Sequence, residues 1–200
     1  MDGKTPLNLA AGFAVGIVVF VVFFVVVMTY NAIVALGQRI DKAWANIEVS
    51  LKQRHDELPN VVAAVRGVMA FEQSVLEQVV RLRAAWSPDQ PVRQQAATSE
   101  ATTAAVRQLF AVAERYPELR SQENVQALQA EIERLEGIIA DRRELYNDSV
   151  YRYNTRIAQL PAVLLASLFG WTPRPFFAVD PADRLRPEVT LSTATPGPTA

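Results

Sequence analysis

A run of twenty apolar or glycine residues, from Leu9 to Met28, constrains this chain more than any other feature of its sequence. No Asp, Glu, Lys, Arg or His interrupts the sequence between Lys4 and Arg39. The hydrocarbon core of a bilayer, about 30 Å thick, is crossed by roughly 20 helical residues. A lone span in lipid must satisfy its own backbone hydrogen bonds, so β-branched residues do not oppose a helix there. The sequence therefore predicts a transmembrane helix over residues 9–30, preceded by a short segment, 1–8.

A cleaved signal peptide is the alternative interpretation of this run. Signal peptides have an apolar core of about 7 to 15 residues, followed by a cleavage site of small residues. The core here is longer, and Val27 to Tyr30 offers no such site. We therefore expect an uncleaved anchor in the lipid bilayer, with Tyr30 as an aromatic residue at the membrane interface.

Two glycines inside the span raise the question of self-association. Gly12 and Gly16 have the GxxxG spacing, which lets two transmembrane helices approach closely. Glycine is also common in spans that do not dimerise. A homo-oligomer formed through this face is thus one alternative for the protein.

The composition excludes several functions. The chain has 20 Lys and Arg against 21 Asp and Glu, for a formal net charge of −1. A nucleic-acid surface needs a basic stripe to neutralise phosphates, so we expect no nucleic-acid partner. The absence of cysteine removes disulfides, thiolate nucleophiles and zinc sites built on sulfur.

Beyond the span, apolar residues recur every three or four positions, the pattern of long amphipathic helices. The pattern predicts an all-α fold: one transmembrane helix followed by an antiparallel bundle over residues 31–160, with helices at about 31–58, 60–86, 91–115 and 119–160. Pro59 interrupts the first stripe, where it must either kink or reverse the helix. Residues 179–200 are rich in Pro, Ser and Thr and are predicted to form a disordered tail.

Residues 161–178 form an apolar, aromatic segment that is too short to cross a bilayer. One interpretation is a cap that folds back over the open end of the bundle. The other is an interfacial segment that places aromatic side chains in the headgroup region beside the anchor. The aromatic residues concerned are Phe169, Trp171, Phe176 and Phe177.

Several polar residues lie beside the apolar stripes and are expected to be partly buried and hydrogen-bonded. These are Arg54, Asn60, Glu72, Arg142 and Asn147. The alternative is a polar groove that receives a partner peptide. Two Tyr-Asn pairs, Tyr146-Asn147 and Tyr153-Asn154, are seven residues apart and share one helical face. Core packing is the first interpretation of these pairs, and a contact surface for another protein is the second.

Several segments of this chain resemble sequences of the LemA family. The matching segments are Tyr30-Asn31, AWANIEVSLKQRHDELPNVVAAVRG with its Trp44 (43–67), Glu72, Tyr116-Pro117-Glu118-Leu119, RRELYNDSVYRYNTRI (142–157) and LFGWTPRPFF (168–177). The resemblance implies a bundle of four long helices attached to the membrane by one N-terminal span. It implies no agreed biochemical activity.

The same resemblance bears on partner and location. Genes of LemA-like proteins often neighbour one for a TPM-domain membrane protein, which implies such a partner. Some relatives carry a lipoprotein signal whose cysteine precedes the Tyr-Asn pair, and by analogy this favours a single-pass protein of the cell membrane with an extracytoplasmic bundle. Other relatives are described with the bundle in the cytoplasm, which is the alternative location. The positive-inside rule does not decide the orientation of the span, because positive charges flank it on both sides. Lys4 and the amino terminus precede the span, and Arg39 and Lys42 follow it.

No motif in the sequence indicates catalysis. A di-iron site in a bundle needs paired Glu-x-x-His motifs, and His55 is the single histidine and lacks this spacing. Neither GxSxG nor a phosphate-binding glycine loop is present. We therefore expect no metal, no cofactor and no enzymatic activity. The sequence favours a membrane-anchored scaffold or adaptor; the alternatives are a self-associating protein that shapes the membrane and, more remotely, an unrecognised enzyme.

Overall fold

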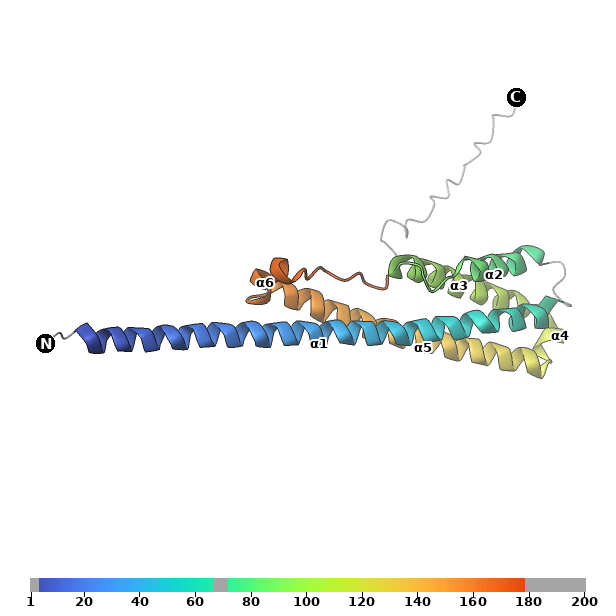
Figure 1. The fold of residues 1–200 in the computed structure, drawn as a ribbon. Coiled ribbons are helices and arrows are strands. Elements are labelled where there is room, and N and C mark those ends of the chain that lie inside the picture. Colours follow the sequence, from blue (N-terminus) through green and yellow to red (C-terminus); the bar gives the residue numbers. More distant parts are fainter. Residues whose placement is uncertain (1–3, 67–71, 179–200) are drawn as a thin grey trace, which may run out of the picture.

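The computed structural model describes residues 4–66 and 72–178 (Figure 1). These residues form six helices and no strand, which confirms the all-α prediction. The helices are α1 (Lys4–Arg66), α2 (Gln73–Ala85), α3 (Val92–Ala113), α4 (Pro117–Arg120), α5 (Glu123–Ala158) and α6 (Ala162–Phe169). The predicted tail, 179–200, lies outside the described residues.

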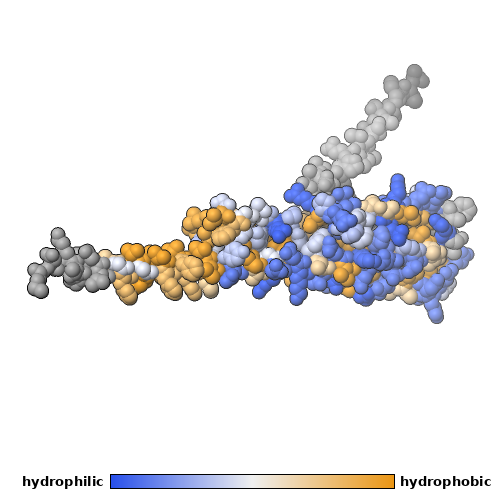
Figure 2. Space-filling view, viewed as in Figure 1, coloured by the Kyte–Doolittle hydropathy of each residue, from blue (hydrophilic) through white to orange (hydrophobic). Residues whose placement is uncertain are grey.

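Helix α1 carries both the apolar run and the first helix of the bundle. Its 63 residues would extend about 95 Å at the usual helical rise. Side chains from residue 11 to 28 are almost all exposed, and Figure 2 shows them as a continuous apolar surface. From Ile33 onward, one face of the same helix is buried in the bundle. It is the one described helix long and apolar enough to cross a membrane, judged by length and composition.

Two predicted helix boundaries in this region are wrong. Helix α1 already begins at Lys4, within the segment expected to precede the span, and it continues through Pro59 to Arg66 without reversing (Figure 1). Proline removes one backbone hydrogen bond, but Leu58 and Val61 on either side are both buried. Packing of these flanking residues therefore holds the helix together across the proline, and the next helix starts at Gln73.

The remaining bundle is made from two helix pairs. Helix α5 runs antiparallel to α1 along most of its length, while α2 and α3 form a hairpin that covers the far end of this pair (Figure 1). The predicted helices at 91–115 and 119–160 correspond to α3 and α5, with the short α4 in the turn between them. Helix α3 packs against α2, and α5 packs against α1.

Buried apolar side chains form two separate clusters. The distal cluster joins α1, α2, α3 and the start of α5, and includes Leu58, Val79, Leu109 and Ile132. The proximal cluster, nearer the apolar run, joins α1 to the second half of α5 and includes Ile33, Ile47, Tyr146, Val150 and Phe177. The proximal half of the bundle has only two long helices, and the C-terminal segment completes its core.

This C-terminal segment turns sharply after α6. Gly170 ends the helix in the left-handed conformation, with φ of 67°, and the Trp171 amide donates to the Ala166 carbonyl at 2.9 Å. Glycine suits this position because it lacks the Cβ that opposes a positive φ. The turn sends residues 171–177 back along α5, and we call these residues the strap.

Candidate functional site

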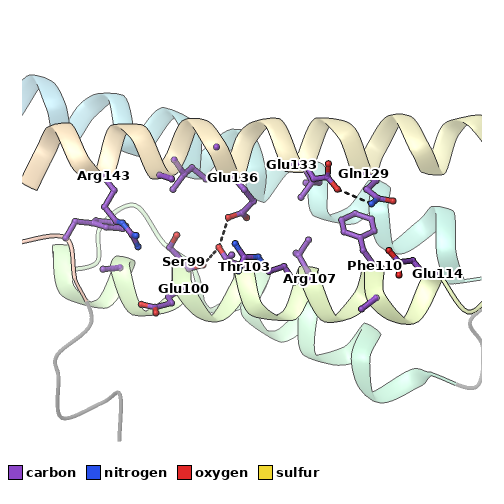
Figure 3. A pocket seen from close by; sticks show the side chains of 18 residues that line it. Ser99, Glu100, Thr103, Arg107, Phe110, Glu114, Gln129, Glu133, Glu136 and Arg143 are labelled. Atoms are coloured by element: carbon purple, nitrogen blue, oxygen red, sulfur yellow. Dashed lines mark hydrogen bonds between the residues drawn. The ribbon is translucent and has the colours of Figure 1, made fainter. Parts of the chain in front are cut away.

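A groove between α3 and α5 is a broad concavity with a volume of about 670 Å³ (Figure 3). It forms because α3 and α5 pack on other helices rather than closely on each other. Its lining comes from one face of each helix, together with Phe177: Ala96, Ser99, Glu100, Thr103, Val106, Arg107, Phe110 and Ala111 from α3, Glu114 directly after α3, and Gln129, Ile132, Glu133, Glu136, Gly137, Ile139, Ala140 and Arg143 from α5.

The groove combines small side chains with a charged rim. Ala111, Gly137 and Ala140 leave room beside the helix backbones, and a Cβ added at Gly137 would meet nothing within 4 Å. Exposed charges of both signs line the edges, as Glu100 and Arg107 do. Phe110 and Gln129 lie near one end in Figure 3. The groove is therefore amphipathic and has space for side chains from another segment.

A polar network that joins three helices forms the floor of the groove. The side chain of Arg54 on α1 is only 4% exposed, and its Nη1 lies 2.7 Å from Glu136 Oε1 on α5. The same guanidinium donates to Thr103 Oγ1 at 2.9 Å and to Ser99 Oγ at 2.9 Å on α3. Thr103 Oγ1 in turn lies 2.7 Å from the second carboxylate oxygen of Glu136. The buried charge is therefore both paired and hydrogen-bonded, as burial requires.

The network separates the two apolar clusters of the core. On α1, Arg54 lies between Leu51 of the proximal cluster and Leu58 of the distal one, and on α5 Glu136 lies between Ile132 and Ile139. Sequence analysis predicted the burial of Arg54 but missed its partners. Their signal is weak: Ser99 and Thr103 are polar residues four positions apart on an alanine-rich helix, and Glu136 is one of many charged residues on α5.

Of the other polar residues expected to be partly buried, Arg142 and Glu72 are partly buried, whereas Asn60 is exposed. Arg142 donates to the Asn46 carbonyl at 2.6 Å and to Ser50 Oγ, so it ties α5 to α1 as expected. Glu72 precedes α2 and forms an ion pair with Arg115, with 3.7 Å between Glu72 Oε1 and Arg115 Nη2. Asn60 is exposed and donates to Glu57, one turn earlier on the same helix. The expectation that Asn60 is partly buried is therefore wrong: α1 continues through Pro59 and leaves Asn60 on its exposed face.

The two asparagines of the seven-residue repeat bind the strap. Asn154 accepts a hydrogen bond from the Arg174 amide at 2.8 Å and donates to the Arg174 carbonyl at 3.0 Å. Asn147 does the same with Phe177, at 2.8 and 3.3 Å. Each side-chain amide thus pairs with both backbone groups of one residue, as a neighbouring β-strand would.

The spacing of the repeat explains how both asparagines reach the strap. Seven helical residues rise about 10.5 Å, and three residues of extended chain cover about 10 Å. Asn147 and Asn154 on the helix therefore match Phe177 and Arg174 on the strap. Both asparagines were predicted to serve the core or a partner protein, and in the structure they hold the protein's own C-terminal segment.

Aromatic packing completes the contact between strap and bundle. The ring of Trp44 lies 5.5 Å from that of Tyr146 and 6.0 Å from that of Phe177, measured between centroids. Tyr146 and Tyr153 are both buried, which confirms the core-packing interpretation of the two tyrosines. The Tyr146 hydroxyl donates to the Pro175 carbonyl at 2.9 Å, and burial raises the pKa of this phenol, which keeps it a neutral donor.

The four aromatic residues predicted to be interfacial do not act together. Phe177 is only 3% exposed and belongs to the bundle core, so its assignment to the headgroup region is wrong. Phe176 is exposed, but as the neighbour of Phe177 it lies near Trp44, about 21 Å along α1 from Tyr30. Phe169 and Trp171, in contrast, both contact the ring of Tyr30, with centroids 5.1 and 6.1 Å from it.

The two glycines of the span lie on an exposed part of α1. A Cβ added at Gly12 or Gly16 would meet nothing within 4 Å. Self-association through them stays a prediction.

The fold and groove define a class of all-α proteins in which one continuous helix joins an apolar N-terminal run to an elongated bundle. A family model described as LemA matches residues 43–191 of the chain. The chain therefore belongs to the LemA family, which confirms the resemblance seen in its sequence. Comparison with curated proteins finds no match.

Proposed function

We propose that this LemA-family protein is a single-pass membrane adaptor that binds a helical segment of another membrane protein in the groove between α3 and α5. The observation that carries the proposal is the continuity of α1, which joins the exposed apolar run to the floor of the groove without a break. The C-terminal part of α1 is buried in the bundle, whereas its N-terminal part is apolar and exposed. The two parts therefore require different surroundings, protein for the first and lipid for the second.

Helix α1 would hold the groove at a defined height above the bilayer. From Tyr30, two residues after the apolar run, to Arg54, which binds side chains that line the groove, the helix rises about 36 Å. A partner that reaches the groove must therefore project from the membrane by a similar distance. A second membrane protein with a domain next to the bilayer meets this condition.

The shape and charge of the groove favour a helical occupant. Its α3 lining extends from Ala96 to Glu114, which corresponds to about 27 Å of helix. A helix laid between two others uses small residues for close approach and polar residues at its edges for specificity. The rim carries Glu100 and Glu133 as well as Arg107 and Arg143, so an amphipathic helix with charges of both signs would fit. By family resemblance, the proposed partner is a TPM-domain membrane protein.

Binding is favoured over catalysis by the position of the single histidine. His55 is not part of the groove lining; its ring packs on Trp86, with centroids 4.8 Å apart. The groove therefore lacks the usual general base for nucleophilic hydrolysis. We propose accordingly that the protein is not an enzyme and needs no cofactor.

Site-specific photocrosslinking in native membranes tests the adaptor. A photoreactive amino acid at Ala111, in the groove, should crosslink one membrane protein, and Gly137→Trp, which fills part of the same groove, should abolish that product. The matched control is Ala127→Trp, on an exposed position of α5 outside the groove lining, which should leave crosslinking unchanged. Equal loss in both tryptophan variants, or crosslinks that do not depend on position, would reject the groove as the binding site.

The side of the membrane rests on family resemblance alone, and an extracytoplasmic bundle is our proposal. A protease added to intact cells should then remove a tag placed after Ala200. A tag that is degraded only after lysis would place the bundle in the cytoplasm.

A further inference from the structure

We infer that α6 is a second membrane contact: it lies in the interface of the leaflet from which α1 emerges and inserts the side chains of Leu164 and Leu168 into it. The inference rests on the proposed membrane anchoring by α1. It adds an interfacial surface formed by the C-terminal end of the domain, far from the span in sequence.

Aromatic contacts fix the position of α6 relative to the span. The ring of Phe169, at the end of α6, lies 5.1 Å from the ring of Tyr30, and the ring of Trp171 lies 5.1 Å from that of Phe169. Tyr30 follows directly on the exposed apolar part of α1. The eight residues of α6 extend about 12 Å, so the whole helix lies near the height at which α1 leaves the apolar region.

The outer surface of α6 is unusual for a part of the protein in water. Leu164 is 71% exposed and Leu168 is 75% exposed, one turn apart on the same face. Leu160 and Val163 are exposed beside them, whereas Ala162 is fully buried against the bundle. No ionisable residue occurs from Leu160 to Trp171. Figure 2 shows this surface as an apolar patch beside the apolar surface of α1.

The bilayer is the occupant that these observations favour. The hydrocarbon core is about 30 Å thick and the membrane with headgroups about 40 to 45 Å, so each interfacial layer measures about 5 to 8 Å. Helix α6 ends within or next to this layer because Phe169, its last residue, touches Tyr30. Tyrosine and tryptophan are the residues enriched there, and Tyr30 and Trp171 supply both. The patch is thus continuous with the membrane-spanning surface.

Fluorescence quenching in vesicles tests the inference on the full-length chain. Because the chain has no cysteine, single substitutions Leu164→Cys and Leu168→Cys each accept one environment-sensitive dye. The labelled proteins are reconstituted in phosphatidylcholine and phosphatidylglycerol vesicles. Quenching is measured with a lipid whose acyl chain carries a nitroxide near the headgroup, and with iodide present on both sides of the membrane.

Two further positions calibrate the result. A dye at Phe20→Cys reports on the span, and a dye at Val49→Cys reports on an exposed site about 28 Å beyond Tyr30. We expect dyes at 164 and 168 to be quenched by the nitroxide lipid and to be several-fold less sensitive to iodide than the dye at 49.

The outcomes distinguish α6 from the anchor. Full iodide quenching at 164 and 168 together with lipid quenching at 20 would overturn the inference and leave the anchor intact. Absence of lipid quenching at 20 would overturn the anchor itself, and with it the inference. Dyes at 164 and 168 that are shielded from both quenchers would show a protein on this face, such as a second copy of the chain, and would also overturn the inference.

Discussion

Arg54 and Glu136 form an ion pair across the centre of the bundle, with 2.7 Å between Nη1 and Oε1, although 82 positions separate them in sequence. The pair joins α1 to α5 at the level where the two apolar clusters meet. Glu136 of this pair also lines the groove. A single polar layer thus contributes to the register of the helices and to the proposed binding surface.

Loss of Arg54 should be costly. Replacing one member of a buried ion pair leaves the other charge uncompensated, so Arg54→Met should lower the free energy of unfolding by about 3 kcal/mol. Urea denaturation of the full chain in detergent micelles, followed by circular dichroism, measures this loss. The double variant Arg54→Met with Glu136→Leu should recover most of it, since both charges are then gone.

The exposed pair Lys52–Asp56 provides the matched control for this experiment. Its atoms lie 2.6 Å apart on one helix, but both side chains are more than half exposed. Lys52→Ala should therefore change the free energy of unfolding by only about 0.5 kcal/mol. A similar loss in Arg54→Met and Lys52→Ala would contradict the role assigned to the buried pair.

Release of the strap is a local effect that hydrogen exchange can detect. Asn154→Ala removes two hydrogen bonds to Arg174, together about 2 kcal/mol, so amide exchange at Arg174 should accelerate about 30-fold. Asn154→Asp keeps the acceptor and should give a smaller acceleration. Asn46→Ala, on an exposed position of α1, should leave the strap unchanged. Unchanged exchange in Asn154→Ala would show that Trp44 and Tyr146 hold the strap without the asparagines.

The same substitution should have opposite effects at two glycines. At Gly137, inside α5 with open space around it, alanine should stabilise the protein by about 0.5 to 1 kcal/mol. At Gly170, with φ of 67°, alanine should destabilise the C-terminal segment by about 1 kcal/mol, because an L side chain strains this conformation. Thermal melts of the bundle test the first effect, and the rate of chymotrypsin cleavage after the buried Phe177 tests the second. Destabilisation by Gly137→Ala would mean that α3 and α5 are closer than the groove allows.

His55 predicts a dependence of stability on pH. The pKa of His55 lies below its usual value of 6.5, chiefly because of burial and secondly because of the charge of Arg83. The charge of Lys52 lowers this pKa further, whereas the charge of Asp56 raises it. The unfolded chain therefore binds the proton more readily than the folded protein does. Stability should fall as the pH drops below 6.5, until the folded imidazole is also protonated. His55→Gln should show a smaller fall between pH 7.5 and 5.5 in urea denaturation, and an equal fall would assign the effect to other groups.

The sequence by itself determined the helical class, the extent of the apolar span and the stripes of α3 and α5. These properties depend on local periodicity and on the length of an apolar run, which the order of residues displays directly. Arg54, Arg142, Tyr146 and Tyr153 could also be placed in or beside the core, because each interrupts or continues a stripe.

Only the tertiary structure decided which residues meet. The passage of α1 through Pro59 depends on packing against α2 and α3, and the pairing of Asn147 and Asn154 with the strap depends on a chain reversal at Gly170. The groove exists because α3 and α5 pack on different partners, a relationship that no helical period records. Periodicity identifies the buried face of a helix, whereas the partner of that face is determined by the positions of all the other helices.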